Sequence, residues 1–390
     1  MKIGLAQPDL GYGGAEAAAI WGLQALREQH ELTLLTLDRV DLERLNAFYG
    51  TSLAAGQFRV RQPAAGLGRL LKGHRVRRAF FQRFCSGVHK EFDLLVSTHN
   101  PLDVGVPALH LVADFSWSPQ TWWELQGPLH RTALRSIHRL AGLRTAYGLL
   151  VRWLARPSGR DLFSGQDRIV ANSRFTAEVL RERLGIEPAG VLYPPVCGAA
   201  DPLPFARREP GFVCLGRLRP EKRIEQIIEI LARVRDRGHR VHLHVVGGPL
   251  ASGYARSLRR LARARGDWVV WEGERIGREK WELLARHRFG IHACQGESFG
   301  IAVAEMCKAG CVVFAPDRGG PAEILADRRL LFRTTEEAVA KIDAVLRDEA
   351  LARRLSAQLL LRGGEFSAER FMEGFRRTVG EFALGRARSG

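Results

Sequence analysis

Short apolar runs alternate with helical patterns along the whole chain. This alternation is typical of parallel βαβ construction, in which helices cover the faces of a sheet. The pattern predicts one parallel sheet with strands at residues 3–6, 32–37, 93–98 and 168–171. It predicts a second sheet with strands at residues 212–215, 241–246, 268–272, 289–292 and 312–314. We therefore expect an α/β protein with two sheets.

The length of the chain also indicates two domains. A single hydrophobic core stops growing at about 250 to 300 residues, and this chain has 390. Proline-rich segments at residues 193–196 and 201–204 lie between the two sets of strands, as expected of a linker. Because ligands of parallel sheets bind at the carboxyl ends of the strands, we expect two Rossmann-like domains, residues 1–195 and 196–368, that face each other across a cleft.

The segment from residue 296 to residue 305 contains the strongest chemical signal. It places Glu297 in a turn and Glu305 on the helix that follows. The N–H groups of Phe299, Gly300 and Ile301 at the start of this helix suit a diphosphate, and the glycine lets the ligand approach the backbone. The two glutamates could then accept hydrogen bonds from sugar hydroxyls on either side of that diphosphate. Taken alone, they could also be one glutamate that stabilises the helix dipole and one that is solvated.

A second motif, residues 216–222, follows the expected strand at 212–215 and precedes a helix expected at 224–237. It carries Arg217 and Lys222. Arginine can bind a phosphate bidentately while lysine acts as a point charge, so the pair suits a phosphate pocket. A solvated basic turn is the alternative interpretation.

Together the two motifs resemble the donor site of retaining glycosyltransferases of family 4, the glycosyl transferases group 1, which have the GT-B fold. The resemblance is specific over about residues 170–325 and loose over the N-terminal half. It implies an acceptor-binding first domain and a second domain that binds a nucleotide diphosphate sugar. It also implies that a C-terminal helix at residues 369–390 crosses back to the first domain.

The resemblance assigns roles to individual residues. It implies that Arg217 and Lys222 hold the donor diphosphate, that Glu305 binds the nucleotide ribose and that Glu297 meets the transferred sugar. It further implies that the sugar keeps its anomeric configuration through front-face substitution, with no protein nucleophile. The chain contains no D-x-D motif. We therefore expect no metal cofactor, and cationic side chains and helix dipoles would stabilise the leaving group instead.

A glycine-rich loop at residues 11–16 follows the first strand. Glycines there allow a positive φ and a close approach to an anion. A dinucleotide fingerprint would need Gly or Ala at the sixth position, where this chain has Glu16, although Asp38 mimics its ribose-binding acid. The family resemblance instead gives the loop to the donor diphosphate or the acceptor, through Gly13 and Gly14.

His110 ends an apolar, strand-like run. A lone histidine beside apolar residues is often a hydrogen-bonded core residue. Family members, however, carry a cleft-facing histidine in the corresponding stretch, near the reacting sugar. The resemblance therefore adds His110 to the catalytic candidates and leaves Asp114 as a weaker one.

The formal net charge is +17 and the pI is about 10.4. Residues 59–90 hold nine Lys or Arg and residues 125–160 hold seven Arg, with no acid in either stretch. Arg131, Arg135 and Arg139 recur on one helical stripe beside apolar faces that include Leu149, Leu150 and Trp153. This pattern suits an anionic membrane surface, where each basic residue adds about 1 kcal/mol. A solvated basic face is the alternative, and no nucleic-acid-binding motif accompanies the charge.

The remaining features concern location and redox state. No run of 18 apolar residues exists, and the first strand is too short for a signal peptide. We expect a cytoplasmic protein that is peripheral at the inner face of the membrane. The six cysteines form no C-x-x-C pair, so we expect reduced core residues rather than metal ligands.

The combined prediction is a hexosyltransferase that glycosylates a hydroxyl of a lipid-linked or polysaccharide precursor. Residues 193–196 and 319–321 resemble most those of mannosyltransferases that build lipid-linked oligosaccharides, which makes GDP-mannose a first, weak choice of donor. The alternatives are another nucleotide-sugar enzyme of GT-B fold, such as an epimerase, and a non-enzymatic basic membrane adaptor.

Overall fold

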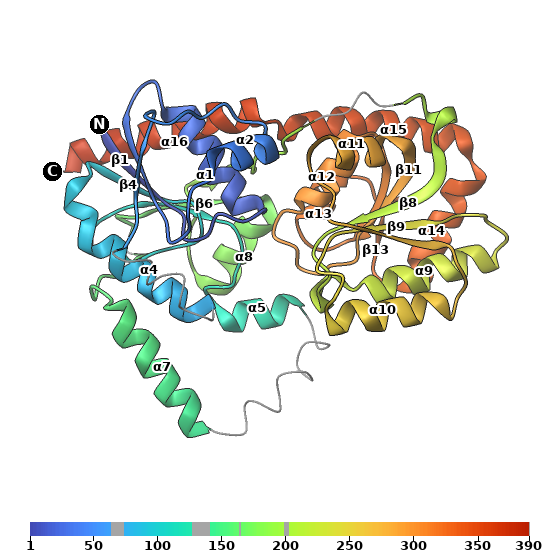
Figure 1. Cartoon of the computed structure of the whole chain (residues 1–390), viewed down its shortest axis with the longest axis horizontal. Coiled ribbons are helices and arrows are strands. Elements are labelled where there is room, and N and C mark those ends of the chain that lie inside the picture. The colour runs from blue at the N-terminus through green and yellow to red at the C-terminus, as the bar shows by residue number, and fades with distance from the viewer. Residues whose placement is uncertain (64–73, 127–140, 164, 199–202, 390) are drawn as a thin grey trace. The chain divides into compact units, whose positions relative to one another are not determined.

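The computed structural model describes residues 1–63, 74–126, 141–163, 165–198 and 203–389 (Figure 1). The chain forms two compact units. Unit 1 comprises Met1–Trp122, Arg131–Pro195 and Ala368–Gly390, and unit 2 comprises Trp123–His130 and Val196–Ser367. None of the described helices is both long and apolar enough to cross a membrane.

Unit 1 is built on a seven-stranded parallel sheet in the order β3-β2-β1-β4-β5-β6-β7. Its strands are β1 (Lys2–Ala6), β2 (Glu31–Leu35), β3 (Arg59–Arg61), β4 (Leu94–Ser97), β5 (Leu109–Val112), β6 (Arg168–Ala171) and β7 (Gly190–Val191). The four strands predicted from the sequence are confirmed. The edge strands β3 and β7 gave no apolar signal because all their residues are exposed.

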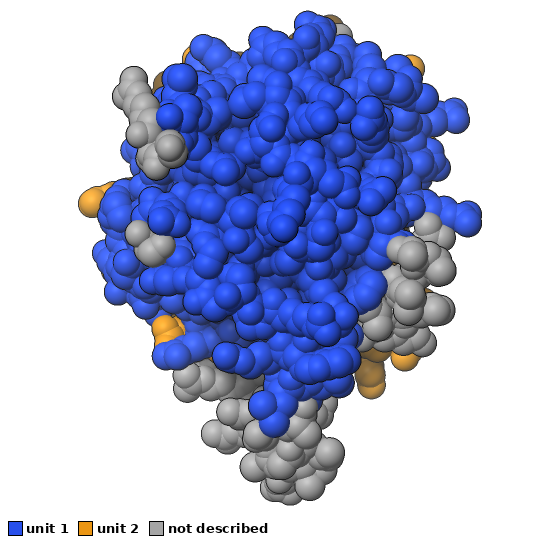
Figure 2. Space-filling model, turned by 90° about the vertical axis from the view of Figure 1, so that its left-hand side faces the viewer, with its two compact units in different colours: residues 1–122, 131–195, 368–390 blue, residues 123–130, 196–367 orange. Residues whose placement is uncertain are grey.

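Six α-helices of the described chain accompany this sheet. They are α1 (Gly14–Leu26), α2 (Leu42–Tyr49), α4 (His74–Val88), α7 (Ala141–Ala155), α8 (Arg174–Leu184) and α16 (Ala368–Ser389). A further helix, α5 (Pro119–Gln126), begins in unit 1 and ends in unit 2. Ser173 caps α8 and Asp41 caps α2, each by accepting a backbone N–H of the first turn. Figure 2 shows unit 1 as a closely packed body.

The C-terminal helix α16 belongs to unit 1, where it packs on α1. It buries Phe371, Phe375, Val379 and Phe382, which recur at helical spacing. Gly22 of α1 makes this contact close, because a Cβ there would lie 3.0 Å from the Phe375 ring. Arg376 also donates a hydrogen bond of 2.7 Å to the carbonyl of Ala25.

Unit 2 is built on a six-stranded parallel sheet in the order β10-β9-β8-β11-β12-β13. Its strands are β8 (Glu209–Leu215), β9 (Leu243–Val246), β10 (Val269–Gly273), β11 (His287–Ile291), β12 (Val312–Pro316) and β13 (Leu331–Phe332). All five predicted strands are confirmed. β8 and β11, however, begin earlier than predicted, which brings Glu209 and His287 into the sheet.

The helices of unit 2 include α9 (Ile224–Asp236), α10 (Gly253–Arg263), α11 (Gly277–Arg286), α12 (Ile301–Lys308), α13 (Gly320–Leu325), α14 (Thr335–Arg347) and α15 (Glu349–Gly363). The helix predicted at 224–237 is α9. The phenylalanines Phe212, Phe289 and Phe314 of three neighbouring strands pack against one another in the core. The parallel strands all end at one edge of the sheet, where the two predicted motifs meet.

Candidate functional site

Two loops build the candidate site at the carboxyl edge of the unit 2 sheet. The first loop follows β8 and contains Arg217 and Lys222, and the second follows β11 and contains Glu297. The first loop is held against the loop after β9, because Leu218 donates a hydrogen bond of 2.9 Å to the Gly248 carbonyl. A Cβ at Gly247 would lie 1.9 Å from the Gly216 carbonyl oxygen, so the two backbones approach as closely as glycine allows.

An ion pair joins the two motifs. Lys222 Nζ lies 2.5 Å from Glu297 Oε2, and both side chains are about four-fifths buried. His292 follows the end of β11 and places its Nε2 3.4 Å from the same carboxylate oxygen. The structure therefore brings together two residues that lie 75 positions apart in the sequence.

This pair holds both groups in their charged forms. Burial alone would raise the pKa of Glu297, but the Lys222 ammonium and the His292 ring outweigh it, and the pKa lies well below its usual range. Burial alone would lower the pKa of Lys222, but the Glu297 carboxylate outweighs it and raises that pKa. Burial lowers the pKa of His292, whose ring is therefore neutral at pH 7. The site thus presents one fixed cation and one fixed anion, and Glu297 cannot act as a proton donor near neutral pH.

The start of α12 lies beside this pair. Gly300 caps the helix with φ of 99°, a left-handed conformation that favours glycine. The segment 319–321 packs directly under it, because a Cβ at Gly320 would lie 2.3 Å from the Phe299 carbonyl oxygen. The backbone N–H groups that begin α12, which include that of Ile301, point toward this edge, because the first residues of a helix have no carbonyl one turn earlier to bind. The side chain of Phe299 is itself buried against Phe366, so its contribution to a ligand would come from the backbone.

Glu305 takes part in a second ion pair. Its Oε1 lies 2.6 Å from Lys280 Nζ of α11, and both side chains are nearly buried. A carboxylate has further lone pairs beyond the one that Lys280 uses, so Glu305 can still accept a hydroxyl. Sequence reasoning missed Lys280, because it lies in an ordinary amphipathic helix with no motif around it.

Arg217 differs from the other predicted residues because it is exposed. Within the described chain Arg217 makes no ion pair. Its positive charge nevertheless opposes protonation of Lys222, and so it offsets part of the rise in the Lys222 pKa that Glu297 causes. Two cations therefore share this edge of the sheet. An anionic ligand would relieve their repulsion, since each positive charge is stabilised by a nearby negative one.

Sequence reasoning also missed His292 and Cys294, although the expected strand at 289–292 had placed the histidine at its carboxyl end. The two side chains lie with Glu297 in a group that could hold a metal ion. The Lys222 ammonium already neutralises the carboxylate of that group, however. The six cysteines all lie in the described residues and form no disulfide. Five of them are buried, as expected of core residues, and Cys197 is partly exposed.

The glycine loop of unit 1 is held by its own neighbours. The Gly13 N–H donates to the Tyr49 hydroxyl at 3.2 Å, and that hydroxyl donates to the Gly11 carbonyl at 2.8 Å. Gly13 has φ of −153°, and Gly14 begins α1. Gly11, Gly13 and Gly14 do not use the positive φ that glycine allows. The role of Gly13 and Gly14 in binding stays a prediction.

Asp38, which mimics the acid of a dinucleotide site, is engaged within unit 1. Its Oδ1 lies 3.1 Å from Arg77, and its Oδ2 accepts the Leu10 N–H at 2.9 Å. Arg77 also binds Asp9 at 2.5 Å. These contacts tie α4 to the loop after β1.

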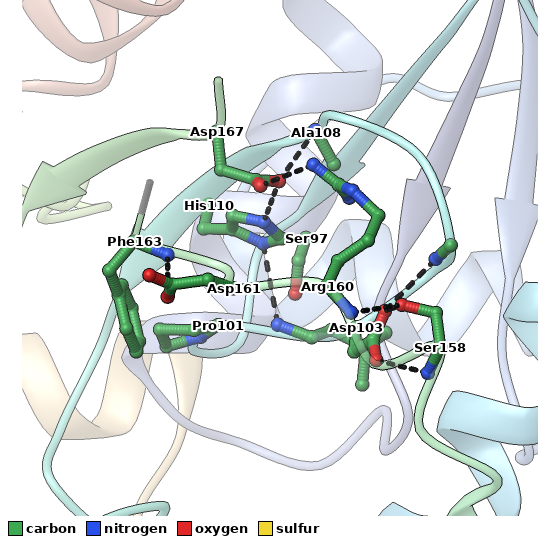
Figure 3. Close-up of polar contacts among 12 residues, drawn as sticks. Ser97, Pro101, Asp103, Ala108, His110, Ser158, Arg160, Asp161, Phe163 and Asp167 are labelled. Carbon is green, nitrogen blue, oxygen red and sulfur yellow. Dashed lines mark hydrogen bonds and ion pairs between the residues drawn. The ribbon is translucent and has the colours of Figure 1, made fainter. Parts of the chain in front are cut away.

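His110 lies in β5 with its side chain fully buried (Figure 3). Its Nε2 donates to Asp167 Oδ1 at 3.1 Å, and its Nδ1 accepts the Leu102 N–H at 3.4 Å. Asp167 also accepts the Ala108 N–H and binds Arg160, each at 2.9 Å. Both ring nitrogens are therefore used within unit 1, as in a core histidine. The catalytic role of His110 stays a prediction.

The basic stripe predicted at Arg131, Arg135 and Arg139 lies outside the described residues, as does 64–73 of the other basic stretch. The described part of α7 leaves Leu149 63% exposed and Trp153 61% exposed. α7 packs on α4. The described chain thus exposes an apolar face within a basic region.

Comparisons with known proteins identify the family of the chain. Residues 200–359 match the family described as Glycosyl transferases group 1. The chain is similar to a D-inositol 3-phosphate glycosyltransferase of Nocardia farcinica, with 28% identity over 308 residues that cover 71% of this chain and 67% of the relative. It is also similar to a GDP-mannose-dependent alpha-(1-6)-phosphatidylinositol monomannoside mannosyltransferase of Mycobacterium tuberculosis. There the identity is 30% over 273 residues, which cover 59% of this chain and 68% of the relative.

Solved structures show the same architecture. The crystal structure of Anabaena HepE in complex with UDP and glucose matches with a TM-score of 0.65 and 18% identity, and the match covers 97% of this chain and 99% of HepE. At this identity the likeness shows the fold alone. The two units, each with its own parallel sheet, form a GT-B fold, as predicted.

Proposed function

Because the chain belongs to the Glycosyl transferases group 1 family and is a glycosyltransferase of GT-B fold, we propose that it is a retaining hexosyltransferase of family 4 that binds its donor at the carboxyl edge of unit 2. The observation that carries this proposal is the ion pair of Lys222 and Glu297 at the start of α12. The loop after β11 offers N–H groups to a diphosphate and a carboxylate to a sugar, and the loop after β8 adds the cation.

In the proposed complex the diphosphate lies at the N–H groups of Gly300 and Ile301, next to Lys222 and Arg217. Glu297 accepts a hydroxyl of the transferred hexose, and Glu305 accepts the ribose hydroxyls. The ion pair with Lys222 keeps the Glu297 carboxylate ionised before the donor arrives, and the contact with Lys280 holds the Glu305 side chain in place. This preorganisation lowers the cost of arranging charges when the reaction begins.

Catalysis then depends on stabilising the leaving nucleoside diphosphate. Negative charge grows on the diphosphate as the glycosidic bond breaks, and Lys222 gains interaction energy at that moment. The acceptor hydroxyl attacks from the face that the diphosphate leaves and gives its proton to the departing diphosphate oxygen, which retains the anomeric configuration. Lys222, Arg217 and the α12 dipole supply the positive charge for this step, and we propose that the reaction needs no metal ion.

One of the named relatives supports a choice of donor sugar and base. The similar mannosyltransferase of Mycobacterium tuberculosis is GDP-mannose-dependent by name, which supports GDP-mannose as the donor. A thermal-shift series with GDP-mannose, UDP-glucose and dTDP-glucose tests this choice. The largest stabilisation is expected with GDP-mannose, and a larger one with either other donor would replace it.

We also propose a lipid-linked acceptor and peripheral binding to an anionic membrane. The support is the net charge of +17 and the exposed side chains of Leu149, Leu150 and Trp153 on α7. Unit 1 would then bind the acceptor. Binding to phosphatidylglycerol vesicles should weaken in Trp153→Ala and in the triple variant Arg131→Gln, Arg135→Gln, Arg139→Gln, and it should fall as salt rises.

A matched control exists for this membrane experiment. Leu361 of α15 is 80% exposed, so Leu361→Ala removes from unit 2 an apolar side chain that is even more exposed than Trp153. Vesicle binding should be unchanged in this control. Equal binding of the parent, Trp153→Ala and the triple variant would show that the basic face is merely solvated.

Product analysis with a labelled donor tests the transferase reaction itself. A transferase releases nucleoside diphosphate in step with glycosylation of the acceptor. An epimerase would instead return an altered nucleotide sugar, and a membrane adaptor would leave the donor intact. Either of these two results would contradict the proposed function.

A further inference from the structure

Three histidines and a glutamate meet at the amino edge of the unit 2 sheet. Glu209 begins β8, His244 lies in β9 with His242 just before that strand, and His287 begins β11. These three strands are neighbours in the sheet, and His287 pairs in register with Glu209. The cluster therefore lies at the edge opposite the donor site, about 16 Å away along β11 by strand geometry.

The side chains present their ligand atoms to one common point. Glu209 Oε2 lies 3.5 Å from His242 Nε2 and 3.7 Å from His287 Nε2. Arg286 pairs with the other oxygen, Oε1, at 3.3 Å and leaves Oε2 to face the histidines. The centroids of the His244 and His287 rings are 4.4 Å apart. One potential ligand atom from each of the four residues lies within 4.8 Å of the others.

Second partners fix the tautomers of two of these rings. His287 Nδ1 donates to the Leu283 carbonyl at 2.7 Å, and this leaves a lone pair on Nε2. His244 Nδ1 lies 2.7 Å from Glu272 Oε1, and Arg275 holds the other oxygen of that carboxylate at 2.9 Å. A carboxylate or carbonyl behind each imidazole is the usual support of a metal-bound histidine.

Among the described residues, two nitrogen atoms of the cluster lack a hydrogen-bond partner. His242 Nε2 and His287 Nε2 are buried, and neither has a hydrogen-bond partner among the described residues. Gly211 leaves the space for the His242 ring, since a Cβ there would lie 2.1 Å from its Nε2. Unpaired buried polar atoms are costly, and a bound ion would remove that cost.

We propose that His242, His244, His287 and Glu209 form a structural zinc site that joins the amino ends of β8, β9 and β11. Three imidazoles and one carboxylate suit a tetrahedral divalent ion, and neutral imidazole is a preferred ligand of zinc. Tetrahedral ligand atoms lie about 3.4 Å apart, so the cluster must contract slightly. Glu209 and His242 can supply that movement, because their side chains are 44% and 29% exposed. This inference is independent of the donor site.

Zinc binding by the full-length chain, purified without a histidine tag, tests the proposal. The chain is stripped with a chelator, equilibrated with zinc and desalted, and its metal content is measured by plasma mass spectrometry. About one zinc ion per chain is expected, together with a higher melting temperature than that of the stripped chain. Co²⁺ in place of zinc should give the intense visible absorption of tetrahedral cobalt.

Two partly exposed ligands allow variants that keep the fold. His242→Asn and Glu209→Gln should each weaken zinc binding at least tenfold and remove the thermal shift. His239→Asn is the matched control, because His239 lies in the same unit but binds Asp343 at 2.6 Å. The proposal is overturned if the parent retains no zinc, or if His242→Asn and Glu209→Gln retain as much as His239→Asn.

Discussion

A glycine-containing loop joins a parallel strand to a helix in each unit, and the two loops are built differently. In unit 1 the loop before α1 uses the N–H of Gly13 to bind Tyr49, and the Glu16 carboxylate folds over that glycine. In unit 2 the loop before α12 has glycines of positive φ at Gly296 and Gly300. Glu297, the acidic residue of this loop, forms an ion pair with Lys222.

The difference shows what a strand–glycine–helix pattern requires before it can bind an anion. The pattern alone supplies N–H groups and a helix dipole, but local side chains can occupy both. In unit 2 a separate loop of the same sheet, the one after β8, brings two cations, Lys222 and Arg217, to the loop before α12. We therefore assign the donor diphosphate to unit 2 and leave the unit 1 loop to the acceptor, and the predictions below test that assignment.

The largest effect is expected for Lys222→Ala. Removing a group that stabilises charge in the transition state costs about 10²- to 10³-fold in kcat, while donor affinity should fall less. Steady-state kinetics and donor titration measure the two quantities. Lys341→Ala, which removes a partly exposed lysine of α14, is the control. Equal losses in kcat and in affinity would mean that Lys222 only binds the donor.

A large effect of pH is expected for the stability supplied by Glu297. Its pKa is depressed in the folded chain, so the stabilisation is complete above the unfolded value of about 4.3 and is lost as pH falls through the folded pKa. The difference in unfolding free energy between the parent and Glu297→Gln should therefore be constant from pH 6 to pH 8 and shrink below about pH 4. Denaturant unfolding measures it, and a difference that grows toward acid would contradict the ion pair.

A moderate effect is expected for Glu305→Ala. The loss of a ribose hydrogen bond should weaken donor binding by about 1 to 3 kcal/mol. Calorimetry on the folded variant measures this change. Lys280→Ala is the comparison variant that makes the test specific. It removes the ion-pair partner of Glu305 and leaves the carboxylate free to accept a hydroxyl. Donor affinity that is unchanged in Glu305→Ala would remove this residue from the site.

A small effect on the donor is expected for Tyr49→Phe. This change removes only the hydroxyl that Gly13 binds in unit 1. Donor affinity should change less than about twofold, since a single neutral hydrogen bond outside the donor site is lost, while the KM of the acceptor rises. If donor binding falls as far as in Glu305→Ala, the unit 1 loop also holds the donor, and the contrast between the loops fails.

No effect on turnover is expected from EDTA, because cationic side chains take the place of a metal in the proposed mechanism. Activity is measured well below the melting temperature, so that loss of zinc from the amino edge does not unfold the chain. Inactivation by EDTA that Mg²⁺ or Mn²⁺ reverses would contradict metal independence.

Much of this site could be predicted from the sequence, for a physical reason. Lys222, Glu297 and Gly300 lie in the loops that follow strand ends, six to nine residues after them, and parallel strands bring such loops to one edge. Lys280 could not be predicted, because its contact with Glu305 depends on how α11 packs against α12. The histidine cluster was also missed, because β8 and β11 extend beyond their apolar runs and only the sheet register brings Glu209 to His287.

Hydrogen–deuterium exchange with and without GDP or UDP tests the central claim most directly. A nucleoside diphosphate bound at the start of α12 should slow exchange of the amides of residues 299–302 in unit 2. The amides of residues 11–16 in unit 1 should not change, because Tyr49 and α1 already hold that loop. Protection confined to residues 11–16, with none at 299–302, would contradict the assignment of the donor site to unit 2.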